Sequence, residues 1–209
     1  MTVRTLAGLV GVVLAACAVA GCGSRGGAPP GGSIPVSPGA SSPAPTSGAG
    51  VARASGAFAV YSAQNTATAI TYDRAQVPAG ATATVTSTPA GQGTQVELQV
   101  AGLLPNHAYG AHVHTRRCGA TGEDAGPHYQ NRNDPHQPST DPAYANPQNE
   151  VWLDFTTNAQ GAADVKTTVP WRFRADGAHS VVIHQTHTMT GPGQAGVAGA
   201  RLACVTVPF

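Results

Sequence analysis

Residues 82–100 read TATVTSTPAGQGTQVELQV, with alternating apolar side chains at Ala83 and Val85 and again at Val96, Leu98 and Val100, and Pro89-Ala90-Gly91 between the two halves. A period of two is typical of a half-buried β-strand, and Pro and Gly favour a turn. This stretch therefore predicts a β-hairpin. No segment of the chain shows the longer apolar period of an amphipathic helix, so we expect strands throughout the domain.

Short runs of the same kind recur along the chain. Turn residues separate them, for example Pro78-Ala79-Gly80, Pro105-Asn106 and Asp176-Gly177. Regularly spaced short strands with such turns predict an all-β fold, an antiparallel sandwich or barrel. We expect strands at residues 58–62, 67–72, 82–88, 95–100, 108–114, 151–155, 163–169, 180–184 and 202–207.

Residues 115–149 interrupt this rhythm. They show no strand pattern and are rich in Gly, Pro, Asn and His. Long segments without regular structure are usually functional when they occur in compact domains. This loop contains Cys118, His128 and His136, so we expect it to carry part of a site. A second irregular stretch, rich in Gly, covers residues 188–200.

The N-terminal residues indicate export. Residues 1–21 combine a weakly positive start, an apolar run and small residues before Cys22, which is typical of a secretory signal peptide. A cysteine directly after Ala-Gly resembles a bacterial lipobox, so we expect Cys22 to be lipidated and to anchor the protein to the outer face of the cell membrane. An ordinary signal peptide is the alternative. Residues 22–50 are rich in Gly, Pro and Ser and predict a tether, and residues 51–209 predict one domain.

Charge and cysteine content narrow the possible functions. The chain has 11 Lys+Arg and 10 Asp+Glu residues, and Lys166 is its single lysine. Nucleic-acid binding needs clustered cations, so the sequence predicts none. Of the four cysteines, Cys17 leaves with the signal peptide and Cys22 takes the lipid. Cys118 and Cys204 remain, and in an oxidising compartment a disulfide is the expected state of such a pair.

Four histidines form the candidate site. His112 and His114 lie two apart in an expected strand, so both side chains point to one face and can reach one metal ion. His184 ends the apolar run Val181-Val182-Ile183, which predicts a buried strand with the histidine at its rim. His128 lies in the long loop. Imidazole is the commonest protein ligand of redox-capable metals. The alternatives are solvated surface histidines at 112 and 114 and a lone core histidine at 184.

Arg201 precedes Cys204 by three residues, so the same disulfide would hold its surroundings in place. An arginine keeps its charge and presents a rigid set of donors. Beside a metal with an open position it would attract and orient a small anion. A surface ion pair is the alternative role.

These motifs, in this order, resemble copper/zinc superoxide dismutase. The resemblance covers residues 58–207 and implies a Greek-key β-barrel of about eight antiparallel strands. It rests on His112-Val113-His114, Gly126-Pro127-His128, Val182-Ile183-His184 and the closing stretch Ala198-Gly199-Ala200-Arg201-Leu202-Ala203-Cys204. The lipobox is similar to that of exported bacterial members of the family.

The resemblance implies residue roles and an activity. It places Arg201 beside the copper channel and pairs Cys118 with Cys204. The activity it implies is dismutation of superoxide to dioxygen and hydrogen peroxide, with His128 handling a proton. A homodimer is compatible with it, although no apolar stripe predicts the surface. The implied copper ligands are His112, His114, His128 and His184.

The residues that would bind zinc depart from the family pattern. His136 stands where the first further zinc ligand could be, but no histidine occurs between His136 and His179. A closed zinc site normally needs four ligands. An oxygen could come from Asp141, Glu150 or Asp154, or one of these carboxylates could orient His128 instead. We therefore expect a copper-only variant and leave zinc binding open.

Two other functions remain open at this point. The domain could be a non-enzymatic lipoprotein that binds or buffers copper at the cell envelope, with the same four histidines and negligible turnover. It could also be a sandwich that keeps only the fold and binds no metal.

Overall fold

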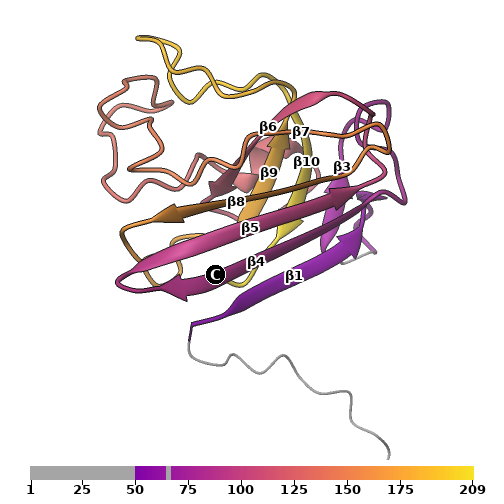
Figure 1. Ribbon diagram of the computed structural model, residues 1–209, viewed down its shortest axis with the longest axis horizontal. Helices are drawn as coiled ribbons and strands as arrows, with labels where there is room; N and C mark the ends of the chain where they lie inside the picture. The colour runs from indigo at the N-terminus through magenta and orange to yellow at the C-terminus, as the bar shows by residue number, and fades with distance from the viewer. Residues whose placement is uncertain (1–49, 65–66) are drawn as a thin grey trace, which may run out of the picture. The chain divides into compact units, whose positions relative to one another are not determined.

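The computed structural model describes residues 50–64 and 67–209, which form two β-sheets (Figure 1). The expected signal peptide, Cys22 and residues 22–49 of the tether lie outside the described residues. Among the described residues, no helix is both long and apolar enough to cross a membrane. The four-stranded sheet has the order β1 (Ala52–Ala57), β4 (Thr82–Ala90), β5 (Gly93–Ala101) and β8 (Ala163–Val169). The six-stranded sheet has the order β2 (Ala59–Val60), β3 (Ala69–Thr71), β10 (Arg201–Thr206), β9 (Ser180–His184), β6 (Ala108–His114) and β7 (Phe155–Thr156).

The predicted hairpin is present. β4 and β5 pair antiparallel from Thr82 opposite Ala101 to Ala90 opposite Gly93. The turn is tighter than expected, because both strands continue to the pair Ala90 and Gly93. Gly91, with φ of 58°, adopts the left-handed conformation that this turn requires. The all-β, two-sheet architecture expected from the sequence is confirmed.

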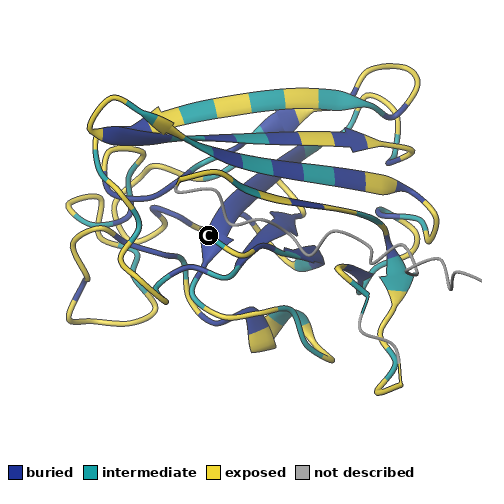
Figure 2. Ribbon diagram, turned by 90° about the horizontal axis from the view of Figure 1, so that it is seen from below, coloured by how far each residue is buried: buried dark blue, intermediate teal, exposed yellow. Residues whose placement is uncertain are grey.

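The core lies between the two sheets, and burial follows the strand period (Figure 2). In the four-stranded sheet, inward residues such as Val85 and Leu98 are fully buried while their neighbours are partly exposed. β9 is buried along its whole length, as its continuous apolar run predicts. The outer side of β9 and β10 is covered by a short 3-10 helix, η1 (Gly122–Ala125), through Ala125, Val182 and Cys204.

Three expectations about strands need correction. β1 was not expected, because Ala-Arg-Ala-Ser-Gly-Ala lacks β-branched residues, yet it pairs along the edge of β4. Residues 151–155 do not form a continuous strand: only Phe155–Thr156 belong to β7, and Trp152 makes an isolated bridge to His112. β2 and β3 pair parallel, in a domain otherwise expected to be antiparallel.

The disulfide between Cys118 and Cys204 is formed, with an S–S distance of 2.03 Å. It joins the long loop to β10 across a sequence separation of 86 residues. Closing a loop of this length removes conformations from the unfolded chain, worth about 4.6 kcal/mol in the chain-entropy description. The disulfide therefore fixes the base of the loop that carries His128.

Candidate metal centre

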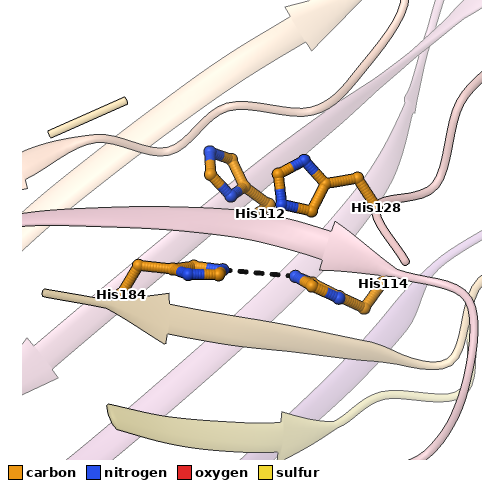
Figure 3. Close-up of side chains that lie close together, drawn as sticks. All are labelled: His112, His114, His128 and His184. Carbon is orange, nitrogen blue, oxygen red and sulfur yellow. Dashed lines mark hydrogen bonds between the residues drawn. The ribbon is translucent and has the colours of Figure 1, made fainter. Parts of the chain in front are cut away.

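The sheet brings the four predicted histidines together. His112 and His114 lie on one face of β6, and β9 pairs beside it so that His184 is opposite Gly110. His128 reaches the same place from the long loop, where it forms an isolated bridge with His114. One nitrogen from each of the four rings lies within 4.8 Å of the others (Figure 3). Residues from three separate parts of the sequence thus form one cluster.

Burial keeps three of the cluster histidines neutral. His112 and His114 are fully inaccessible, and His184 is 4% exposed. Burial, together with the neighbouring histidines, holds the pKa of His112 and of His114 well below the usual value. Burial also lowers the pKa of His184 to about 3. Neutral imidazole is the form that binds metals, and the Nδ1 atom of His112 is buried without a hydrogen-bond partner among the described residues. This donor set fits a copper ion, which imidazole nitrogens suit.

Backbone contacts fix which nitrogen of His114 can act as a ligand. Its Nδ1 lies 2.9 Å from the carbonyl oxygen of Gly126, an acceptor, so Nδ1 carries the proton. Its Nε2 therefore presents a lone pair, and this atom lies 3.3 Å from Nε2 of His184. Figure 3 shows the two rings turned so that these nitrogens face each other.

Arg201 begins β10 and is tied to the long loop. Its Nη1 donates to the carbonyl oxygens of Gly122 at 2.9 Å and Gly126 at 2.8 Å. Its Nε lies 3.6 Å from Oε1 of Glu123, whose side chain is 82% exposed. The Gly126 carbonyl also accepts a hydrogen bond from His114, so Arg201 and a cluster histidine share one acceptor. Burial lowers the pKa of Arg201 from its ordinary value, but a guanidinium remains charged at neutral pH.

A cavity of about 560 Å³ opens beside the cluster. His128 and Glu150 lie in its wall, together with the charged residues Arg116, Glu123 and Arg201, and residues 137–140 also line it. A small anion that enters this cavity meets a guanidinium and an imidazole together.

Residues 79–207, more than half of the chain, match the family described as copper/zinc superoxide dismutase. The chain belongs to the copper/zinc superoxide dismutase family. No curated protein matches it significantly.

The solved structures that match this chain include a superoxide dismutase-like protein and a Cu/Zn superoxide dismutase. Two mutants of a superoxide dismutase-like protein from Bacillus subtilis are 21% and 20% identical, each with a TM-score of 0.47. The matches cover 59% of this chain and 86% and 88% of those chains. The Cu/Zn superoxide dismutase from Brucella abortus is 25% identical with a TM-score of 0.45, over 59% of this chain and 86% of that chain.

In this member of the dismutase family, Glu150 occupies the far side of His128. Its Oε2 lies 2.9 Å from Nδ1 of His128 and accepts a hydrogen bond from the indole N–H of Trp152 at 2.7 Å. Its Oε1 accepts from the amide of Gln130 at 2.7 Å. The carboxylate is only 1% exposed. Of the three carboxylates that the sequence left open, Glu150 is the one that contacts His128.

His136 does not join the cluster. It is exposed on the long loop, where its backbone N–H donates to Oδ1 of Asp134 at 2.8 Å. Within residues 50–64 and 67–209, the four-histidine cluster is the group of side chains placed to hold a metal. Nδ1 of His128 is hydrogen-bonded to the carboxylate of Glu150. His136 lies outside the four-histidine cluster, and its contribution to a zinc site stays a prediction.

Some contributors to the site were missed by sequence reasoning. Gln130 and Trp152 hold Glu150, and Thr188 contacts His112. The spacing of Glu150, Trp152 and Asp154 is a period of two, which could have indicated that all three face the histidines. Thr188 lies in an irregular Gly-rich stretch and carries no such signal.

We expect the metal-free protein to lose stability as the pH falls below about 6.5. In the folded state burial holds the pKa values of His112, His114 and His184 below the ordinary value of 6.5, whereas the unfolded chain protonates its histidines near that value. Between the two values the unfolded state binds more protons, so each histidine costs about 1.4 kcal/mol per pH unit. Urea unfolding of the metal-free chain at about pH 7 and about pH 5 measures this, and equal midpoints would contradict it.

Proposed function

We propose that this chain is a copper-dependent superoxide dismutase. The observation that carries the proposal is the group of four histidines, three of them buried, beside a cavity lined by Arg201, in a chain that belongs to this family. The proposed copper ligands are His112, His114, His128 and His184. Copper bound there would supply one-electron redox chemistry, so that two superoxide ions and two protons give dioxygen and hydrogen peroxide.

Arg201 would bind and orient the anion. Two backbone carbonyls hold its Nη1, so the guanidinium keeps one position at the edge of the cavity. A fixed donor group costs no reorganisation when the negative charge arrives. Because the chain carries few charges, we expect the attraction to act over a short range around this residue.

His128 would handle a proton. Its Nδ1–H is held by the carboxylate of Glu150, so its Nε2 is the nitrogen available to the cluster and the cavity. A proton taken up at Nε2 makes the ring an imidazolium, and the adjacent negative charge of Glu150 compensates it. His128 could then donate that proton to reduced substrate and return to its neutral form.

We also propose that the centre works without zinc and at the cell envelope. Glu150 supports the first point, since it gives His128 the orientation that a metal on Nδ1 would otherwise provide. The lipobox-like sequence before Cys22 and the Gly/Pro/Ser-rich stretch that follows support the second.

The test is superoxide consumption by the full chain after loading with copper, with copper and zinc per chain measured in the same sample. We expect turnover in proportion to bound copper and no requirement for zinc. Tight copper binding with no more superoxide consumption than the metal-free protein shows would favour a copper-buffering lipoprotein. Absence of stoichiometric copper would remove both functions.

Replacing Arg201 by Ala should lower kcat/KM for superoxide on the order of 10- to 100-fold, because the attraction at the cavity is lost. The remaining activity should also depend less on salt concentration. Arg117→Ala is the matched control, since Arg117 is exposed and lines a different cavity. Equal losses in the two variants would show that general charge, and not the position of Arg201, matters.

A further inference from the structure

Thr188 and Asp154 form a chain of hydrogen bonds that ends at His112. Nε2 of His112 lies 2.7 Å from the hydroxyl oxygen of Thr188. That hydroxyl donates to Oδ1 of Asp154 at 2.6 Å, and the backbone N–H of Thr188 donates to Oδ2 of the same carboxylate at 2.8 Å. Both oxygens of Asp154 therefore accept a hydrogen bond from Thr188.

The carboxylate of Asp154 sets the direction of these hydrogen bonds. An ionised carboxylate can only accept hydrogen bonds, so the single hydroxyl proton of Thr188 points to Asp154. The hydroxyl oxygen can then only accept from His112, and Nε2 of His112 must carry the ring proton. A neutral imidazole has one N–H, so Nδ1 of His112 presents a lone pair. This is the buried atom that has no partner among the described residues.

His128 is held in the opposite tautomer. Glu150 accepts from its Nδ1, which leaves Nε2 for the cluster. Glu150 and Asp154 belong to one short segment, and Val151 and Leu153 between them are buried in the core. Their packing fixes the segment. A single stretch of backbone thus sets the tautomers of two histidines through two different carboxylates.

We propose that Thr188 and Asp154 are positioning residues that hold His112 as the Nε2–H tautomer and so present its Nδ1 lone pair to the metal. The proposal rests on the proposed function only for the identity of the ion. The tautomer itself is a property of the metal-free protein and can be measured without any turnover.

The first test uses ¹⁵N NMR of the histidine rings in the full metal-free chain at neutral pH. Protonated and unprotonated ring nitrogens have distinct shifts, so each tautomer is observed directly. We expect His112 to carry its proton on Nε2 in the native protein and in Thr188→Ser, which keeps the hydroxyl. In Thr188→Val, Nε2–H loses its acceptor, and the Nδ1–H form should become populated. Thr186→Val is the matched control, because that hydroxyl is exposed and, among the residues that the structure describes, donates to the carbonyl of His187 alone.

Asp154→Asn provides a sharper test, because it should reverse the direction of the hydrogen bonds that link His112, Thr188 and residue 154. The backbone N–H of Thr188 requires an acceptor, so the amide oxygen of Asn must face it and the NH₂ group must face the hydroxyl. The hydroxyl then accepts from Asn and donates to His112, which moves the ring proton to Nδ1. His128 should keep its Nδ1 proton in every one of these variants, which shows that the centre is still folded.

Copper affinity gives a second readout. In competition with a chelator, we expect Thr188→Val and Asp154→Asn to bind copper about 10- to 100-fold more weakly than the native protein. Thr188→Ser, which keeps the hydroxyl, should bind copper as the native protein does. An Nε2–H form of His112 that persists in both Thr188→Val and Asp154→Asn would overturn the proposal, and so would an equal change in Thr186→Val. If the native chain shows no dismutase activity, the proposed function fails while the NMR result still decides this inference.

Discussion

Replacing His184 by Ala is expected to remove high-affinity copper binding and to lower superoxide consumption by about 100-fold or more. Loss of a supporting group alone typically costs about 10- to 100-fold, and His184 would be a ligand itself. The fold should survive, because β9 keeps its backbone pairing with β6 and β10. Copper per chain and superoxide consumption, measured on one preparation, check both parts of this prediction.

His136→Ala is the control for that experiment. It also removes an imidazole, but from an exposed position outside the cluster. We expect it to keep native copper content and native activity. Equal activity in His184→Ala and the native protein would exclude the catalytic role of the cluster.

Replacing Glu150 by Ala should lower both stability and activity. Three buried or partly buried donors, from His128, Gln130 and Trp152, would lose their acceptor. Unpaired buried donors are costly, so we expect a loss of about 3 kcal/mol in the free energy of unfolding. The ring of His128 would also lose its orientation, and activity should fall about 10- to 100-fold.

Glu150→Gln separates these two effects. It keeps the shape and one acceptor oxygen but removes the charge that would compensate a protonated His128. We expect it to be more stable than Glu150→Ala and still impaired in superoxide consumption. Glu97→Gln, on the exposed face of β5, is the matched control. A Glu150→Ala protein as stable and as active as the native chain would contradict the role given to this carboxylate.

The parts of the fold that the sequence predicts are those with a local cause. β6, β8 and β9 have the expected ends because alternation or a continuous apolar run marks them. β1 escapes prediction because its small residues form a strand only when β4 offers an edge. Residues 151–154 look like a strand by composition, but Trp152 alone pairs with β6, through an isolated bridge to His112, and the neighbouring Glu150 bridges to Gln130 in the long loop.

The residues of the site also divide into those that a local sequence pattern predicts and those that depend on tertiary packing. The histidine pair in β6 follows from side-chain alternation, and His184 from the end of a buried run. The choice among Asp141, Glu150 and Asp154 depended on how the long loop packs, which no local pattern encodes. The structure places Asp141 on an exposed turn, Glu150 against His128 and Asp154 against Thr188.

X-ray absorption at the copper edge of the copper-loaded protein tests the central claim most directly. We expect one copper ion per chain, surrounded by imidazole nitrogens alone among protein ligands, and the loss of one imidazole from the spectrum of His184→Ala. A copper ion bound through sulfur or carboxylate oxygen, or an unchanged spectrum in that variant, would show that the four histidines do not form the metal centre.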